Sequence, residues 1–330
     1  MFEKEPYLSR VARRALIGSI GLLVALGVIF IALRGCTLMP WARSESGKAD
    51  VSVGVTRDFG KVLIKSERVK AGDGDSVMDV LEKVADVRTE YGGGFVSSIE
   101  GLRYSPAAGG GNDWFYYVNG VLAGVGAAEY RVRSGDHLWW DYHAWGKDNF
   151  VPAVVGAYPG PFARGYNGAR NTTTVLYDDR LEGAARKIGG FLESQGASVT
   201  YRANLDEKTA AAAKGPAMVV CDTHKAAGTD WIRRLAVGSG TSVTFLNLQG
   251  DSLIPLDDSG KPGNTGEDVV AAVVATGSGM GDASPRWLVL CSGEKGASEA
   301  VRVLASGTQV LLQKVGVAIG ASGAVYPLPR

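Results

Sequence analysis

The sequence predicts an N-terminal transmembrane helix, then an α+β domain, then an α/β domain with a mostly parallel sheet. Three observations favour this fold class. Residues 15–33 carry no charge, residues 51–142 hold short strand patterns around one helical pattern, and residues 172–319 alternate strand and helix patterns. Such alternation is typical of β-α-β units. The 330 residues also exceed a single typical domain of roughly 100–200 residues.

The charge composition gives no sign of a polyanionic partner. Lysine and arginine number 35, against 34 aspartates and glutamates. A nucleic-acid-binding protein needs an excess of positive charge to neutralise phosphates. We therefore expect no nucleic-acid partner.

The three cysteines are too few and too scattered for a disulfide scaffold or a zinc site. Cys221 and Cys291 each end an apolar run, which favours small buried residues on strands. A disulfide or a reactive thiol is the alternative for this pair.

The uncharged stretch is long enough to cross a bilayer. Its 19 residues would span about 28 Å as a helix. Arginines at positions 10, 13 and 14 precede it, and the positive-inside rule keeps such residues in the cytoplasm. We predict a cytoplasmic tail at 1–14, an anchor at 15–34 and a linker at 35–49. A cleaved signal peptide and lipidation of Cys36 are the alternatives.

The first domain is expected over residues 50–148. Two strand patterns separated by Asp58-Phe59-Gly60 indicate a hairpin, and a helical pattern capped by Asp75 or Ser76 follows it. Asn119-Gly120 between apolar runs indicates a second hairpin. The order strand, strand, helix, strand, strand, strand is typical of a β-grasp fold.

Several segments of this domain resemble the C-terminal β-domain of transcobalamin and intrinsic factor, over roughly residues 50–145. The segments are Gly74–Lys83, Val96–Gly101, Asp113–Gly120, Gly124–Tyr130, Ser134-Gly135-Asp136 and Leu138-Trp139-Trp140. In that family the domain covers one face of cobalamin, and a helical barrel that is missing from this sequence covers the other. The resemblance implies cobalamin as a candidate ligand, with no other cofactor.

The same resemblance implies a set of ligand-binding residues. Trp114 and Tyr116 would face the ligand, and Asn119 with Gly120 would shape the turn beside them. Trp139 completes the predicted set. Strand alternation points Trp114 and Tyr116 to one face of the sheet, and their neighbours Phe115 and Tyr117 to the other. Some rings must therefore lie outside the core, unless loops or the second domain cover them.

No metal site is predicted. His137 and His143 are interpreted as surface residues near strand ends. Asp73 and Asp75 lack the remaining spacing of a calcium-binding loop, which favours helix capping.

The second domain is expected over residues 172–330, after a linker at 149–171 that is rich in proline and glycine. Parallel sheets bind ligands at the carboxyl ends of their strands. No phosphate-binding motif or nucleophile elbow is found there, so no enzyme and no catalytic residue is predicted. The polar positions at these predicted strand ends are Asp178, Asp179, Asp222, His224, Asn247 and Ser292.

Together these features predict a membrane-anchored, extracytoplasmic binding protein that captures a corrinoid or another small molecule for an uptake transporter. The predicted partners are the membrane and either a transporter or a second cobalamin-binding protein. A structural or protein-interaction component of the cell envelope is the alternative, and a hydrolase in the α/β domain is the third hypothesis.

Overall fold

The computed structural model describes residues 49–107, 110–146, 149–238, 242–305 and 308–330, which belong to one compact unit. The predicted anchor at 15–34 lies outside the described residues. Within them, no helix is both long and apolar enough to cross a membrane.

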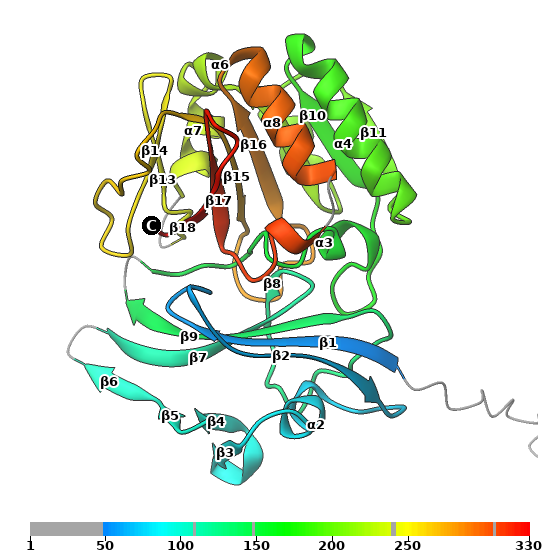
Figure 1. Cartoon of the computed structure of the whole chain (residues 1–330). Helices are drawn as coiled ribbons and strands as arrows, with labels where there is room; N and C mark the ends of the chain where they lie inside the picture. The colour runs from blue at the N-terminus through cyan, green and yellow to red at the C-terminus, as the bar shows by residue number, and fades with distance from the viewer. Residues whose placement is uncertain (1–48, 108–109, 147–148, 239–241, 306–307) are drawn as a thin grey trace, which may run out of the picture. The chain divides into compact units, whose positions relative to one another are not determined.

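The first sheet is mixed and has the order β2-β1-β9-β7-β6, with the short β8 paired to β7. The strands β1 and β2 form the expected hairpin, and β1 pairs in parallel with β9, the last strand of the domain. Figure 1 shows this sheet with α2 against one face. The strands are β1 (Ala49–Arg57), β2 (Val62–Ala71), β6 (Ser105–Ala107), β7 (Gly110–Val118), β8 (Val121–Leu122) and β9 (His137–Gly146).

The helix α2 (Val77–Glu82) begins at Ser76, whose side chain accepts a hydrogen bond from the backbone of Asp79. Its apolar residues pack on the sheet together with Trp114 and Tyr116. The predicted turn at Asn119-Gly120 is present, and both residues have positive φ, as a tight hairpin turn requires. A small sheet follows α2 and consists of β3 (Val87–Glu90), β4 (Phe95–Ile99) and β5 (Leu102–Arg103), with a 3₁₀ turn, η1 (Tyr91–Gly93), before β4.

The second sheet has seven strands in the order β11-β10-β12-β16-β15-β17-β18. Helices α4 and α8 pack on one face, and α6 and α7 lie on the other side (Figure 1). The strands are β10 (Thr173–Tyr177), β11 (Val199–Arg202), β12 (Ala217–Asp222), β15 (Val269–Thr276), β16 (Arg286–Cys291), β17 (Gly316–Gly320) and β18 (Val325–Leu328). The remaining elements are α3 (Gly160–Ala163), η2 (Asp179–Leu181), α4 (Glu182–Ser194), α5 (Glu207–Ala212), α6 (Thr223–Ala227), α7 (Asp230–Val237), β13 (Leu246–Gln249), β14 (Ser252–Pro255), α8 (Gly293–Ala305) and η3 (Thr308–Val310).

The fold class predicted from the sequence is wrong, because this sheet is not mostly parallel. Strands β11, β10, β12 and β16 pair in parallel, whereas β15, β17 and β18 join by antiparallel pairs. The cause is the connection between β15 and β16. Residues 277–285 contain no helix, and a parallel neighbour would need a crossover of about a dozen residues or more.

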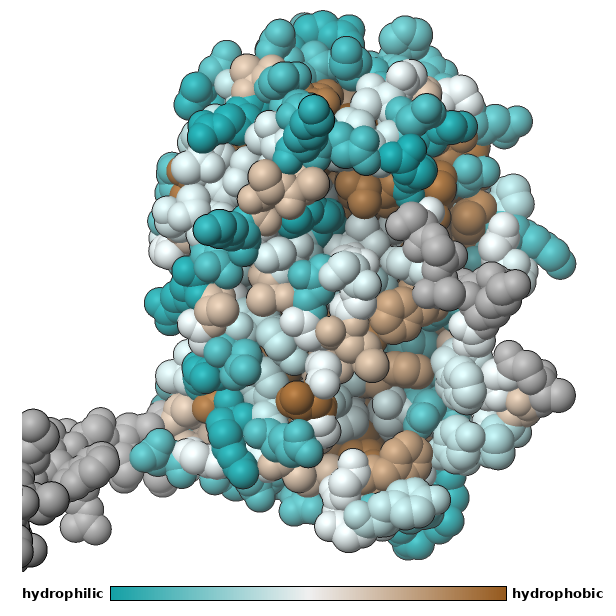
Figure 2. Space-filling model, turned by 180° about the vertical axis from the view of Figure 1, so that it is seen from behind, coloured by the Kyte–Doolittle hydropathy of each residue, from teal (hydrophilic) through white to brown (hydrophobic). Residues whose placement is uncertain are grey.

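Residues 149–171, expected as a linker, contribute to the core. Val151, Val154 and Tyr158 are buried. The backbone N–H of Leu122 donates to Pro152, and that of Val155 donates to Val315, so this segment hydrogen-bonds to elements of both predicted domains. On the face shown in Figure 2, hydrophobic residues form separate patches among hydrophilic ones.

Candidate functional site

The five residues predicted to bind a ligand are all buried. Trp114 and Tyr116 lie on the α2 side of the sheet, where Trp114 Nε1–H donates to the Leu102 carbonyl and the Tyr116 hydroxyl donates to the Val125 carbonyl. Trp139 lies on the opposite face and donates to Thr56 Oγ1 at 2.7 Å. The structure therefore does not gather these three rings at one surface, and their polar atoms are already engaged.

Asn119 and Gly120 form the hairpin turn, as predicted from the sequence. Asn119 Nδ2 donates to Asp136 Oδ1 and to the Gly165 carbonyl, each at 2.8 Å, and its Oδ1 accepts the backbone N–H of His137. This amide has used its donors and its acceptor within the protein.

A pocket of about 320 Å³ opens on the sheet face opposite α2, and we call it the aromatic pocket. Strand β7 contributes alternate residues to it, and β9 contributes His143 and Trp145 from the same face. The segment after β9 forms another wall with Phe150. The residues that line the pocket are Asp113, Phe115, Tyr117, Leu122, His143, Trp145, Gly146, Asn149, Phe150 and Val151.

The strand register explains this grouping. Asp113 pairs with His143, and Phe115 pairs with Asp141, across the antiparallel β7–β9 ladder. Directly opposed residues point to the same face of a sheet. The rings of this face alternate with Trp114 and Tyr116, so the residues predicted from the sequence lie on the other face of the same strand. Trp145, with 40% of its surface exposed, is the most exposed of the described rings at this pocket, and Phe115 and Phe150 are partly buried.

His143 forms the bottom of the aromatic pocket and is held in place on three sides. Its ring stacks between Phe59 and Phe115, with ring centroids 4.4 Å from each. Its Nδ1 lies 2.8 Å from Asp141 Oδ2. Because a carboxylate only accepts, Nδ1 carries a proton. When the ring is neutral, Nε2 presents a lone pair, and this atom has no hydrogen-bond partner in the described part of the chain.

Asp141 is a buried carboxylate whose oxygens are both fully engaged. Oδ2 accepts the backbone N–H of Phe59, and Oδ1 accepts that of Gly60, each at 2.9 Å. Oδ1 also accepts from the Thr56 hydroxyl. Phe59 and Asp58 both have a φ of 60°, a conformation that L-residues rarely adopt. The carboxylate therefore holds a strained turn, and this turn places Phe59 on His143.

Among the described residues that line the aromatic pocket, Asp113 is the one acid. Burial raises the pKa of its carboxyl, against smaller lowering effects from the Trp114 backbone N–H and from His143. Among the described residues that line the pocket, none is a lysine or an arginine. Its polar groups also include the Asn149 amide, which can donate and accept, and the indole N–H of Trp145, which donates.

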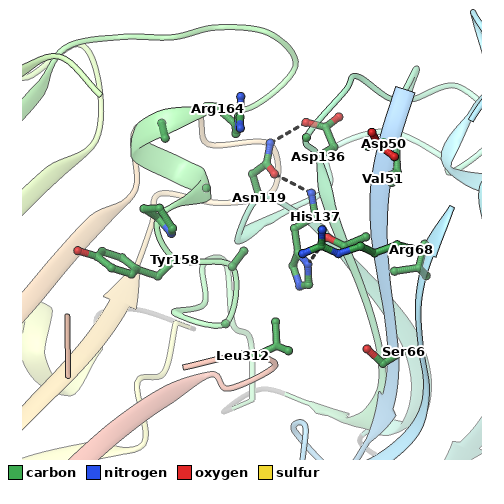
Figure 3. A pocket seen from close by; sticks show the side chains of 18 of the residues that line it. Asp50, Val51, Ser66, Arg68, Asn119, Asp136, His137, Tyr158, Arg164 and Leu312 are labelled. Atoms are coloured by element: carbon green, nitrogen blue, oxygen red, sulfur yellow. Dashed lines mark hydrogen bonds between the residues drawn. The ribbon is translucent and has the colours of Figure 1, made fainter. Parts of the chain in front are cut away.

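A second cavity of about 590 Å³ lies between the first sheet and the segment around α3 (Figure 3). Arg68, Ser52 and His137 stand in one row across β2, β1 and β9, and Figure 3 shows the Arg68 side chain pointing toward His137. Ser52 Oγ lies 2.8 Å from His137 Nδ1, whereas Nε2 is buried without a partner. Burial lowers the pKa of His137 to about 4. Charges of both signs line this cavity, including Asp50, Glu67 and Arg164.

The predicted strand ends of the second sheet carry helix caps. Asp178 accepts the backbone N–H of Arg180, and Asp222 accepts that of His224. Arg180 Nη2 lies 3.4 Å from Asp178 and 3.6 Å from Asp222. Burial raises the pKa of the neighbouring thiols, Cys221 and Cys291, to about 12, so both are protonated at neutral pH and are poor nucleophiles.

Comparison with protein families matches residues 74–144 to a domain of unknown function, DUF4430. The match covers less than a quarter of the chain and extends from the turn before α2 into β9, so it includes Asp113, Phe115 and His143. No curated protein matches the chain in the corresponding comparison.

Among solved structures, the chain is similar to a "putative metal binding protein" from Ruminococcus gnavus ATCC 29149. The two sequences are 15% identical, the similarity covers 29% of this chain and 96% of that one, and the TM-score is 0.25. In the described residues, no group of three or more histidines, cysteines and acidic residues is placed to hold a metal ion.

Proposed function

We propose that this protein binds a small organic molecule in the aromatic pocket, with the ligand lying against Trp145, Phe115 and Phe150. The observation that carries this proposal is a half-exposed tryptophan at the rim of a preformed pocket whose bottom is fixed by His143 and Asp141. Rigid aromatic side chains offer large contact areas at a low cost in conformational entropy. Pockets for small molecules typically combine such walls with a few placed polar groups.

The resemblance to the transcobalamin β-domain supports ligand capture as the type of function. A corrinoid is a large ligand, whereas the aromatic pocket measures about 320 Å³ and would enclose only an edge of one. The residues that the resemblance implies for the ligand also lie in the core. We therefore propose a ligand with about the size of one or two rings, and not an enclosed corrinoid.

The proposed location is the outer face of a membrane, with a transporter as the candidate partner. This part of the proposal rests on the uncharged stretch at residues 15–33 and on the arginines before it. Protease added to intact cells should cleave the folded part of the chain. Protection of this part, under conditions where a known surface marker is cut, would contradict the proposed location.

Binding can be tested on the full-length protein labelled with 5-fluorotryptophan, in which each of the seven tryptophans gives a fluorine signal. Substitution of Trp145 by phenylalanine assigns the signal of this residue. Benzyl alcohol, a single-ring probe, should shift the Trp145 signal in a saturable manner and leave that of Trp114 in place. If the Trp145 signal does not respond to benzyl alcohol at any concentration, the proposal is wrong.

A further inference from the structure

The chemistry of the aromatic pocket narrows the class of ligand, provided that the pocket binds a small molecule as proposed. The lining residues combine ring faces with one carboxylate, a histidine and an asparagine, and include no lysine or arginine within the described chain. Anions, metal ions and organic cations differ in how well they fit this lining.

An anion does not fit this lining. Asp113 would repel an anionic ligand, and the donors of Asn149 and Trp145 are neutral and do not offset this repulsion. The donor of His143 is already directed at Asp141 through Nδ1. The buried negative charge of Asp141 lies directly behind the imidazole, so it disfavours a second negative charge in the pocket.

A bare metal ion does not fit either. Among the described side chains that line the pocket, Asp113, His143 and Asn149 offer ligand atoms of the usual metal-binding types, and no group of three or more histidines, cysteines and acidic residues is placed to hold a metal ion. A protein metal site needs three or four such ligands. The remaining walls are rings, which do not replace the hydration shell of a small hard cation.

An organic cation satisfies both parts of the lining. Aromatic faces attract a cation through the negative potential above the ring, and tryptophan does so most strongly. Asp113 supplies a carboxylate beside these rings, and it is half-buried, where its charge is screened less than at the surface. His143 Nε2 offers an acceptor for a hydroxyl or an N–H of the same ligand.

We propose that the aromatic pocket recognises an organic ammonium ion, with the cationic head between Trp145, Phe115 and Phe150 and close to the Asp113 carboxylate. A trimethylammonium group has the charge and the apolar surface that this lining requires. The aromatic walls then provide apolar contact to any ligand of suitable size, and the attraction between the rings, Asp113 and the positive charge selects a cation over a neutral molecule.

The test compares choline with 3,3-dimethylbutan-1-ol, which has the same shape and a carbon in place of the charged nitrogen. Both are titrated into the full-length protein, and the fluorine signal of Trp145 is followed. Choline should bind about tenfold more tightly than its neutral isostere. Both titrations use the wild-type chain, and a variant is needed only to assign the Trp145 signal.

Two matched variants test whether the Asp113 carboxylate recognises the positive charge of choline. Asp113→Asn should reduce the affinity for choline about tenfold and leave that for 3,3-dimethylbutan-1-ol unchanged. Asp258→Asn, in an exposed turn after β14, removes the same charge elsewhere and should alter neither affinity.

The outcomes separate the two proposals. Equal affinity for choline and its isostere would overturn the ammonium assignment and leave small-molecule binding intact. A Trp145 signal that responds to neither compound, nor to benzyl alcohol, would overturn both. A preference for choline that Asp113→Asn does not reduce would show that the cation is recognised elsewhere, and would also overturn the assignment.

Discussion

His143 Nδ1 lies 2.8 Å from Asp141 Oδ2, and the exposed fractions of the two side chains are only 3% and 1%. This contact connects strand β9 to the turn after β1, because the same carboxylate accepts the backbone N–H groups of Phe59 and Gly60. The bottom of the aromatic pocket is therefore part of the core, and the positions of His143 and Asp141 do not depend on a ligand.

Asp141→Asn should destabilise the protein by about 2–4 kcal/mol. The carboxylate accepts four hydrogen bonds, and an amide would turn a donor toward some of these donors. The free energy of unfolding in urea checks this. Asp251→Asn, an exposed acid in the turn between β13 and β14, serves as the control and should change stability by less than about 0.5 kcal/mol. Equal effects of the two variants would contradict the role assigned to Asp141.

Trp145→Ala and Trp114→Phe should separate binding from stability. Trp145 is 40% exposed at the pocket, so its loss should weaken benzyl alcohol binding about tenfold. Trp114→Phe should leave this affinity unchanged but cost about 1–3 kcal/mol, because the Leu102 carbonyl loses its donor. The two measurements are a ligand titration and urea unfolding. A loss of affinity in Trp114→Phe would instead favour the α2 side of the sheet as the binding face.

The affinity for choline should depend on pH through Asp113. Burial raises the pKa of this carboxyl above its ordinary value of 3.8, so the proton leaves at a higher pH than usual. Only the ionised form attracts the cation, and choline affinity should therefore rise as the pH increases through this raised pKa. Titrations at a series of acidic pH values measure the effect. Asp113→Asn should abolish the pH dependence, and an unchanged dependence in this variant would assign it to another group.

Asp113 should also make the stability of the fold depend on pH. Stability should fall over the same pH range in which choline affinity rises. The folded protein holds the Asp113 proton more tightly than the unfolded chain does, because the pKa is raised on folding. The contribution of this residue to stability therefore falls as the pH increases from 3.8 through the raised pKa. Urea unfolding over this range should show that the wild type loses stability relative to Asp113→Asn as the pH increases. A constant difference in the free energy of unfolding between the two proteins would contradict this prediction.

His137 should make the fold sensitive to acid. Burial lowers its pKa from 6.5 to about 4, so the folded state binds this proton less readily than the unfolded chain. Stability from this residue is complete above 6.5 and declines as the pH falls toward about 4, by an amount on the order of 1–3 kcal/mol. His137→Gln should reduce this decline. A proton NMR titration of the three histidines checks the pKa directly, and a value near 6.5 for His137 would contradict it.

The local elements of the first domain could be read from the sequence because short-range chemistry determines them. The cap at Ser76 and the turn at Asn119-Gly120 each depend on a few neighbouring residues. The mixed second sheet could not be read in this way. Strand β15 is a run of valine and alanine without alternation, and its antiparallel pairing depends on contacts with β16 and β17 that are distant in sequence.

The aromatic pocket could not be predicted from the sequence for a related reason. Alternation along β7 shows that Trp114 and Phe115 point to opposite faces, but it does not show which face α2 covers. The wall formed by Phe150 comes from a segment expected to be a linker. The partner of His143, Asp141, is two residues away on the same strand, and this spacing on one face was the signal that could have indicated a fixed histidine.

The proposed binding function depends most on which face of β7 contacts the ligand. Intermolecular nuclear Overhauser effects between bound benzyl alcohol and the aromatic side chains measure this directly. We expect contacts with the ring protons of Phe115 and Trp145. Contacts with Trp114 and Tyr116 instead would place the ligand on the α2 side and contradict the account.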